Sequence, residues 1–299
     1  MEESLSDKLK ALGVQLGAAH IQPQTPSPKL MDSTKFGKEY FPIEKAVKGE
    51  DFSTPLGSVF VVSEHYPVNL YESHSLTAPD SISDIFLSWV DHTPSENDTF
   101  LFLDTETSGL SGGTGTFPFL IGLGFFEQDG FNLTQIFMRH PEEEPAVLAA
   151  LNRIIDGTNI LVTYNGKSFD VPLINTRHKL HGMSPLFGKD TFTHIDMLPM
   201  ARKIWKSRLP SRTLGDMERQ ILDIYRTDEE VPGWMIPDMY FDYLSTGDAR
   251  PLSRVFYHNA IDIISLALLF NYTNRILSHP LHHDIDNIDL ASIARIYQS

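Results

Sequence analysis

The 299-residue sequence contains no cysteine and no apolar run long enough to cross a bilayer. Without cysteine the chain has no disulfide, no thiolate zinc site and no cysteine nucleophile. Its longest apolar run, FPFLIGLGFF at 117–126, is too short to be a membrane span. The N-terminal MEESLSDKLKALGVQLG has charges of both signs and no apolar core, unlike a signal peptide. We therefore expect a soluble cytoplasmic protein with no membrane partner.

Positive charge is also scarce. The chain has 24 Lys and Arg against 39 Asp and Glu, a formal net charge of −15. Such a balance argues against nucleic acid as a partner, because phosphate contacts normally come from Lys and Arg. Six cations nevertheless gather in ARKIWKSRLPSRTLGDMER at 201–219: Arg202, Lys203, Lys206, Arg208, Arg212 and Arg219. This basic stretch indicates either a solvated helix face or a surface that binds phosphates.

Regular patterning begins after the turn-rich HTPSEND at 92–98. We interpret residues 1–95 as an N-terminal extension, partly linker with small strand and helix elements, 96–279 as one α/β domain and 280–299 as a tail. Apolar runs, hairpin signals and helical spacing predict the following elements: strands at 57–70, 99–107 and 159–165, a hairpin at 117–139 turning at Asp129-Gly130, and helices at 81–91, 142–156 and 251–279. Residues 171–222 are expected to be helical segments.

Gly166-Lys167-Ser168 looks like the end of a phosphate-binding P-loop. That loop requires another glycine five residues before the second one. The residue at that place is Leu161, which lies inside the predicted strand 159–165. The spacing therefore argues strongly against a P-loop NTPase, and it directs attention to Asp170, three residues beyond Lys167.

Acidic residues follow two of the predicted strands. Asp104 and Glu106 end the strand at 99–107, and residues two apart in a strand point to the same face. Adjacent carboxylates repel each other unless a cation lies between them, and oxygen ligands suit Mg²⁺ or Mn²⁺. Taken alone, such a pair is more often a solvated strand end. Asp170 follows the strand at 159–165, where it is either a third acid of the same cluster or a helix N-cap.

Asp262 lies among apolar residues of the predicted helix 251–279, where an unpaired charge is costly. His258 precedes it by one helical turn on the same face. As an isolated pair, His and Asp at this spacing usually form a structural contact. The three motifs together, D-x-E, a later Asp and H-x-x-x-D, favour a shared site.

This order of motifs resembles the DEDDh group (DnaQ-type) of ribonuclease-H-like 3′→5′ exonucleases. The blocks DTETSGL, GGTGTFPFLIGLGFF, YNGKSFDVPLINTR, IDMLPMARKIW and YHNAIDIISL are similar to its YprB-type branch, over about residues 99–270. The resemblance implies a ribonuclease-H-like layered fold, a mixed central sheet flanked by helices. It implies a two-metal hydrolysis of phosphodiester bonds with His258 as the general base. It also implies that two Mg²⁺ or Mn²⁺ ions are held by four residues: Asp104, Glu106, Asp170 and Asp262.

Several other residues have two readings each. Thr107, Asn165 and Lys167 flank the acids as substrate contacts or as structural hydrogen-bonding groups. Asp196 is either an alternative metal ligand or, preferably, the cap of the helix that follows it. Tyr257 precedes His258, which leaves a tyrosine-based variant of the site open, although imidazole titrates near neutrality. Trp205 and Trp234 are expected in the core rather than stacked on bases.

The sequence therefore predicts a metal-dependent 3′→5′ exonuclease acting on single-stranded DNA or RNA. The alternative is a non-catalytic module with the same fold that binds nucleic acid or protein. The complete set of acids favours the enzyme.

Overall fold

A computed structural model of the chain describes residues 40–69, 74–90, 92–93, 95, 98–109, 115–188, 191–227, 229–281 and 285–298. The predicted linker at 22–29 and part of the glycine-rich turn at 108–117 lie outside these residues. Residues 38–299 form one compact unit.

The strands of this unit are β1 (Glu50–Thr54), β2 (Gly57–Pro67), β3 (Phe100–Thr107), β4 (Pro118–Glu127), β5 (Gly130–Phe137), β6 (Ile160–Thr163) and β7 (Thr193–Asp196). The α-helices are α2 (Ile43–Ala46), α3 (Asp84–Val90), α4 (Glu144–Ile154), α5 (Asp170–Leu180), α6 (Met197–Trp205), α7 (Leu214–Met217), α8 (Ile236–Thr246), α9 (Leu252–Ser278) and α10 (Asn287–Tyr297). Short helical turns are η1 (Pro141–Glu143), η2 (Glu218–Leu222) and η3 (Gly233–Met235).

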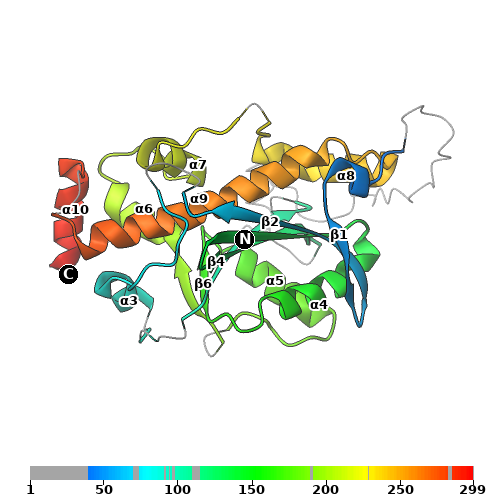
Figure 1. The fold of residues 1–299 in the computed structure, drawn as a ribbon, viewed down its shortest axis with the longest axis horizontal. Helices are drawn as coiled ribbons and strands as arrows, with labels where there is room; N and C mark the ends of the chain where they lie inside the picture. Colours follow the sequence, from blue (N-terminus) through cyan, green and yellow to red (C-terminus); the bar gives the residue numbers. More distant parts are fainter. Residues whose placement is uncertain are drawn as a thin grey trace, which may run out of the picture. The chain divides into compact units, whose positions relative to one another are not determined.

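All seven strands form one mixed sheet in the order β1-β2-β5-β4-β3-β6-β7. The first five are antiparallel neighbours, whereas β6 and β7 run parallel to β3. Helices cover both faces, with α9 crossing one face and α4 and α5 on the other (Figure 1). This architecture confirms the predicted α/β class with a mixed central sheet.

The sheet extends beyond the elements that we predicted for the domain. Strand β2 pairs with β5 from Phe60 to Pro67, so residues of the expected N-terminal extension belong to the sheet. The boundary that we placed at residue 96 therefore does not separate two folding units. Strand β7 was missed because it has only four residues and lies within the segment 171–222, which we expected to be helical.

Side chains on β3 alternate between two apolar layers. Leu101 and Leu103 pack in the layer that includes α4 and α8, whereas Phe100 and Phe102 pack in the layer beneath α9. Because both faces of β3 are covered, its sequence is continuously apolar until Asp104, as expected of a strand buried on both sides. The same alternation places the even-numbered residues that follow on the α9 face.

Helix α9 confirms the predicted helix at 251–279 almost to the residue. By length and composition it could cross a membrane, but 72% of its most apolar window is buried inside the fold. Its apolar character therefore reflects its position as a core helix.

Glycines in β4 allow α9 to approach the sheet closely. A Cβ atom on Gly122 would lie 2.3 Å from Oδ1 of Asn259, and one on Gly124 would lie 2.7 Å from Cγ2 of Ile263. Both distances are far below a normal van der Waals contact, so alanine at either position requires α9 or its side chains to move. These two glycines set the distance between β4 and the helix that holds His258 and Asp262.

We predict that Gly122→Ala lowers the free energy of unfolding by about 1–3 kcal/mol, the usual range for overpacking a core. Urea denaturation measures the change. The matched control is Gly233→Ala, because a Cβ atom there meets nothing within 4 Å. Equal stability of the two variants would show that α9 is not held at this distance by Gly122.

Candidate active site

The two acids of β3 lie on one face of the strand, as their spacing predicts, and that face is the one covered by α9. Asp104 accepts a hydrogen bond at Oδ2 from Nδ2 of Asn259 on α9, at 3.0 Å. Glu106 lies one pleat further along β3 and is buried. Burial raises the pKa of the Asp104 carboxyl well above its usual range, and repulsion from Asp262 and Asp170 raises it further. Burial and the neighbouring acids also raise the pKa of Glu106.

Asp170 begins α5 and joins the same cluster from the other side of the sheet. Its Oδ1 accepts a hydrogen bond of 2.5 Å from the hydroxyl of Thr105, which lies between the two acids of β3. Burial raises the pKa of Asp170 to about 6. The hydrogen bond from Thr105 opposes that rise because it stabilises the charged carboxylate.

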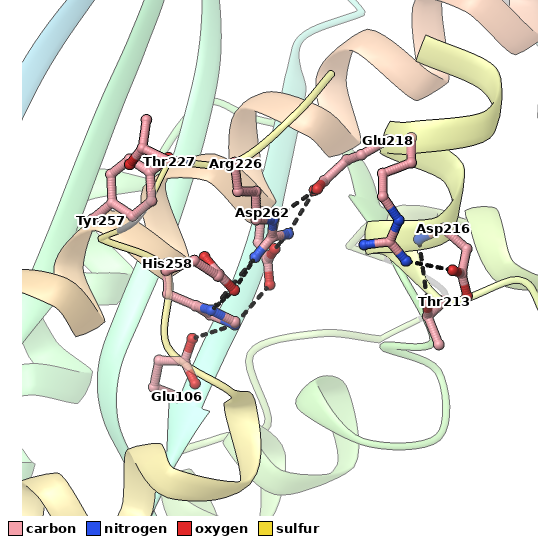
Figure 2. Close-up of polar contacts among 11 residues, drawn as sticks. Glu106, Thr213, Asp216, Glu218, Arg226, Thr227, Tyr257, His258 and Asp262 are labelled. Atoms are coloured by element: carbon pink, nitrogen blue, oxygen red, sulfur yellow. Dashed lines mark hydrogen bonds and ion pairs between the residues drawn. The ribbon is translucent and has the colours of Figure 1, made fainter. Parts of the chain in front are cut away.

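His258 and Asp262 project from α9 toward the end of β3. Nε2 of His258 lies 3.5 Å from Oδ2 of Asp262 and 3.9 Å from Oε1 of Glu106. One ligand atom from each of these three residues lies within 4.8 Å of the other two. Glu106, His258 and Asp262 therefore meet in one place, although they come from two separate elements, β3 and α9 (Figure 2).

Arg226 lies at the centre of this cluster, and sequence reasoning did not identify it. Its guanidinium pairs with Glu218 at 2.5 Å and with Asp262 (Figure 2). It also pairs with Glu230 at 2.8 Å. These carboxylates outweigh the effect of burial and raise its pKa. Arg226 follows η2 in an irregular segment, where neither spacing nor periodicity signals a role.

A chain of two buried polar side chains, Gln135 and Asn259, orients Asp104. Gln135 on β5 donates from Nε2 to Oδ1 of Asn259 at 2.9 Å, and both side chains are almost fully buried. Because Oδ1 of Asn259 is the acceptor of that bond, its Nδ2 faces Asp104. The hydrogen bond lowers the pKa of Asp104 against the larger effect of burial.

Two open clefts meet at the acids and share Asp104, Tyr164 and Asn165. The first has a volume of about 740 Å³ and is also lined by Thr107, Phe169, Asp170 and Leu173. Phe169 is 53% exposed, which is unusual for a phenylalanine and leaves its ring open to a ligand. The second cleft, of about 540 Å³, is also lined by Arg202, Arg212, Thr213 and Asp262.

The basic stretch at 201–219 divides between structural and cleft positions. Arg208 pairs with Asp289 of α10, and Arg219 pairs with the nearby Asp216. Arg202 and Arg212 instead border the second cleft, and no carboxylate of the described residues forms an ion pair with either of them. Part of the stretch thus forms structural ion pairs, and Arg202 and Arg212 lie where a ligand in the second cleft would meet them.

The three residues predicted to contact substrate do not all lie near the acids. Asn165 and Thr107 line the clefts, but Lys167 lines a different cavity together with Trp89 and His194. Asn165 has a left-handed backbone with φ 66°, a conformation that asparagine tolerates.

Asp196 caps α6, as we preferred. Its Oδ1 accepts from the backbone N–H groups of Leu198 and Asn165, and its Oδ2 accepts from the N–H of Lys167. These bonds fix the loop after β6.

The aromatic residues gave one correct and one wrong prediction. Trp205 is 1% exposed and belongs to the core, as expected. Trp234 is 66% exposed, so the prediction of a core position was wrong. It lies in the short turn η3, whose side chains are not covered by the sheet layers. The hydroxyl of Tyr257 accepts a hydrogen bond from the backbone N–H of Thr227, and His258 is the residue that contacts the acids.

A sequence model of the RNase H superfamily matches residues 101–274, more than half of the chain. The chain belongs to the RNase H superfamily. It is similar to the uncharacterized protein YprB of Bacillus subtilis (strain 168), with 30% identity over 242 residues, 78% of this chain and 57% of YprB. The chain thus spans less than two thirds of that relative.

Among solved structures, this RNase H superfamily chain is similar to the family B DNA polymerase of the hyperthermophilic archaeon Pyrobaculum calidifontis. The identity is 13% and the TM-score is 0.47, over 79% of this chain and 31% of the polymerase. A likeness this distant says nothing about function.

The acids of this RNase H superfamily member fit a divalent cation. Burial raises the pKa values of Asp104, Glu106 and Asp170, and neighbouring acids raise those of Asp104 and Glu106 further in spite of Arg226. Carboxylate oxygens are the ligands that hard divalent ions prefer. Nuclease-type activity, which the superfamily supports, commonly depends on such ions.

We predict that Asp170→Asn stabilises the metal-free protein at pH 7.5, by a few degrees in Tm. The pKa of Asp170 is about 6 in the folded chain and lower when it unfolds, so the folded state binds the proton more tightly. Wild-type stability contributed by this group therefore falls as pH rises from about 4 to about 6.

Thermal denaturation in EDTA at several pH values tests this. The difference in Tm between variant and wild type should be small near pH 4, grow up to about pH 6 and stay constant above it. A difference that does not change with pH would mean that the Asp170 carboxylate carries no electrostatic cost.

Proposed function

We propose that this chain is a metal-dependent 3′→5′ exonuclease that hydrolyses phosphodiester bonds of single-stranded DNA or RNA. The observation that supports it most is that Glu106 and Asp262 lie beside the imidazole of His258, and that Asp104 is close enough to Asp262 and Asp170 for their charges to raise its pKa. Burying acids together is costly for stability, and the superfamily fold supports nuclease-type chemistry that uses such a cluster.

Two Mg²⁺ or Mn²⁺ ions, held by Asp104, Glu106, Asp170 and Asp262, would supply electrostatic stabilisation of the scissile phosphate. The chain's own residues supply the rest. His258 accepts a proton from the attacking water at Nε2, the nitrogen that faces Glu106 and Asp262. Asn259 holds Asp104 in a fixed orientation through its Nδ2.

The clefts on either side of Asp104 suit a single strand. The exposed ring of Phe169 offers a surface on which an unpaired base stacks, and Thr107 and Asn165 offer polar groups beside it. Arg202 and Arg212 in the second cleft offer positive charge to backbone phosphates. The positive charge of this cleft therefore allows a nucleic-acid substrate although the chain as a whole has a negative net charge.

We predict that Asp104→Asn and Asp262→Asn abolish metal-dependent degradation of end-labelled oligonucleotides, because each removes a carboxylate that would hold the ions. The assay uses matched DNA and RNA strands blocked at either end, with Mn²⁺ or with EDTA. Asp129→Asn, on an exposed turn of the β4–β5 hairpin, is the matched control. Unchanged cleavage by the two site variants would exclude the proposal, and cleavage that only a 5′ block prevents would reverse the polarity.

We predict that His258→Ala lowers kcat by about 10²–10⁴-fold, the usual contribution of a general base. The variant should still show the rise in Tm that Mn²⁺ causes, since binding to the folded state alone stabilises it and the four carboxyls remain. Loss of the Mn²⁺ shift together with activity would make His258 a metal ligand instead of a base. Full activity would exclude it from the chemistry.

The alternative of a non-catalytic binding module makes a different prediction for the same protein. Binding of a labelled single strand in Mn²⁺ without any shortening of the strand would favour it.

A further inference from the structure

The side of His258 that faces away from the acids contacts Glu230, a residue outside the motifs of the sequence. Nδ1 of His258 lies 2.7 Å from Oε1 of Glu230. A carboxylate has no proton to donate, so the hydrogen of this bond belongs to Nδ1. In neutral imidazole only one nitrogen has a proton, and Nε2 is therefore free.

Arg226 makes the position of the His258 proton depend on Glu230. Its Nη1 lies 3.4 Å from Nδ1 of His258 and 2.8 Å from the same Oε1 of Glu230. Both Arg226 and a protonated Nδ1 donate, and Oε1 of Glu230 accepts from both. Without that oxygen, the group left beside Nδ1 would be a guanidinium, which only donates. Nδ1 would then become an acceptor, and the proton would move to Nε2.

The backbone that holds Glu230 is tied to α9 itself. Arg254, one helical turn before His258, donates from Nη2 to the carbonyl oxygen of Glu230 at 2.7 Å and from Nε to that of Glu229 at 3.0 Å. The hydroxyl of Tyr257 accepts from the N–H of Thr227 at 3.0 Å (Figure 2). Glu230 is thus held in register with the imidazole.

We propose that Glu230 is a positioning residue that fixes His258 in the Nδ1–H tautomer and so leaves Nε2 free to accept a proton. This inference rests on the proposed role of His258 as the general base. A carboxylate that orients an imidazole in this way is a recurring device of acid–base sites. The 2.7 Å contact between Glu230 and the far nitrogen of the imidazole supports it here.

The geometry predicts opposite results for two substitutions at this position. Glu230→Ala removes the acceptor, leaves Arg226 beside Nδ1 and should lower kcat by about 10²–10⁴-fold, as loss of the base would. Its KM should change little, because Glu230 does not line either cleft. Glu230→Gln keeps an oxygen that accepts from both donors, so it should retain most of the activity. Arg226 keeps Glu218 and Asp262 as partners in both variants.

Glu229→Ala is the matched control, since Glu229 is the exposed neighbour of Glu230 and should leave kcat unchanged. A second measurement does not depend on turnover. Two-bond ¹H–¹⁵N spectra of ¹⁵N-histidine protein distinguish the two tautomers, and the His258 signals are assigned by their loss in His258→Gln. They should show Nδ1–H in the wild type and in Glu230→Gln, and Nε2–H in Glu230→Ala.

Each outcome decides between explanations. Equal loss of kcat in the alanine and glutamine variants overturns the inference, since the charge of Glu230 would then explain the loss. Nε2–H in the wild type also overturns it, since Glu230 would then not set the tautomer of His258. If His258→Ala keeps full activity, the proposed role of His258 as the general base fails instead, whatever the spectra show. If His258→Ala is inactive and Glu230→Ala is fully active, only the role of Glu230 is wrong.

Discussion

The close contact between α9 and β4 is the constraint on which the site depends. Gly122 and Gly124 leave no side chain between helix and strand, so α9 lies directly on the sheet. The Nδ2 of Asn259 then donates to Asp104, while the Oδ1 of Asn259 accepts from Gln135. At any larger distance, the imidazole and carboxylate of α9 would no longer meet the carboxylates of β3.

That contact concentrates negative charge in a buried place, and the chain offsets it only in part. Arg226 pairs with three carboxylates, yet Asp104, Glu106 and Asp170 keep raised pKa values. A site of this kind gains stability from a bound cation, which links metal binding to folding. This excess of negative charge is confined to the buried acids of the site, and it is separate from the negative net charge of the whole chain.

Strong periodic signals predicted the elements that build the site. The apolar run before Asp104 and the long apolar helix with His258 and Asp262 were both found with nearly correct bounds. Strand β7 was missed because four residues are too few for a period, and Trp234 was misplaced because composition does not report which short turns the sheet covers. The exposed position of Lys167 away from the acids likewise depends on the turn after β6.

Spacing along the chain determined which carboxyls could act together, because a strand places residues two apart on one face and a helix places residues four apart on one face. Those are local rules, and they apply wherever the fold puts the element. The presence of Arg226 and Glu230 beside His258 was decided only by tertiary structure. Both residues lie in irregular backbone fixed by Arg254 and Tyr257 of α9, and such long-range contacts leave no periodic trace in a sequence.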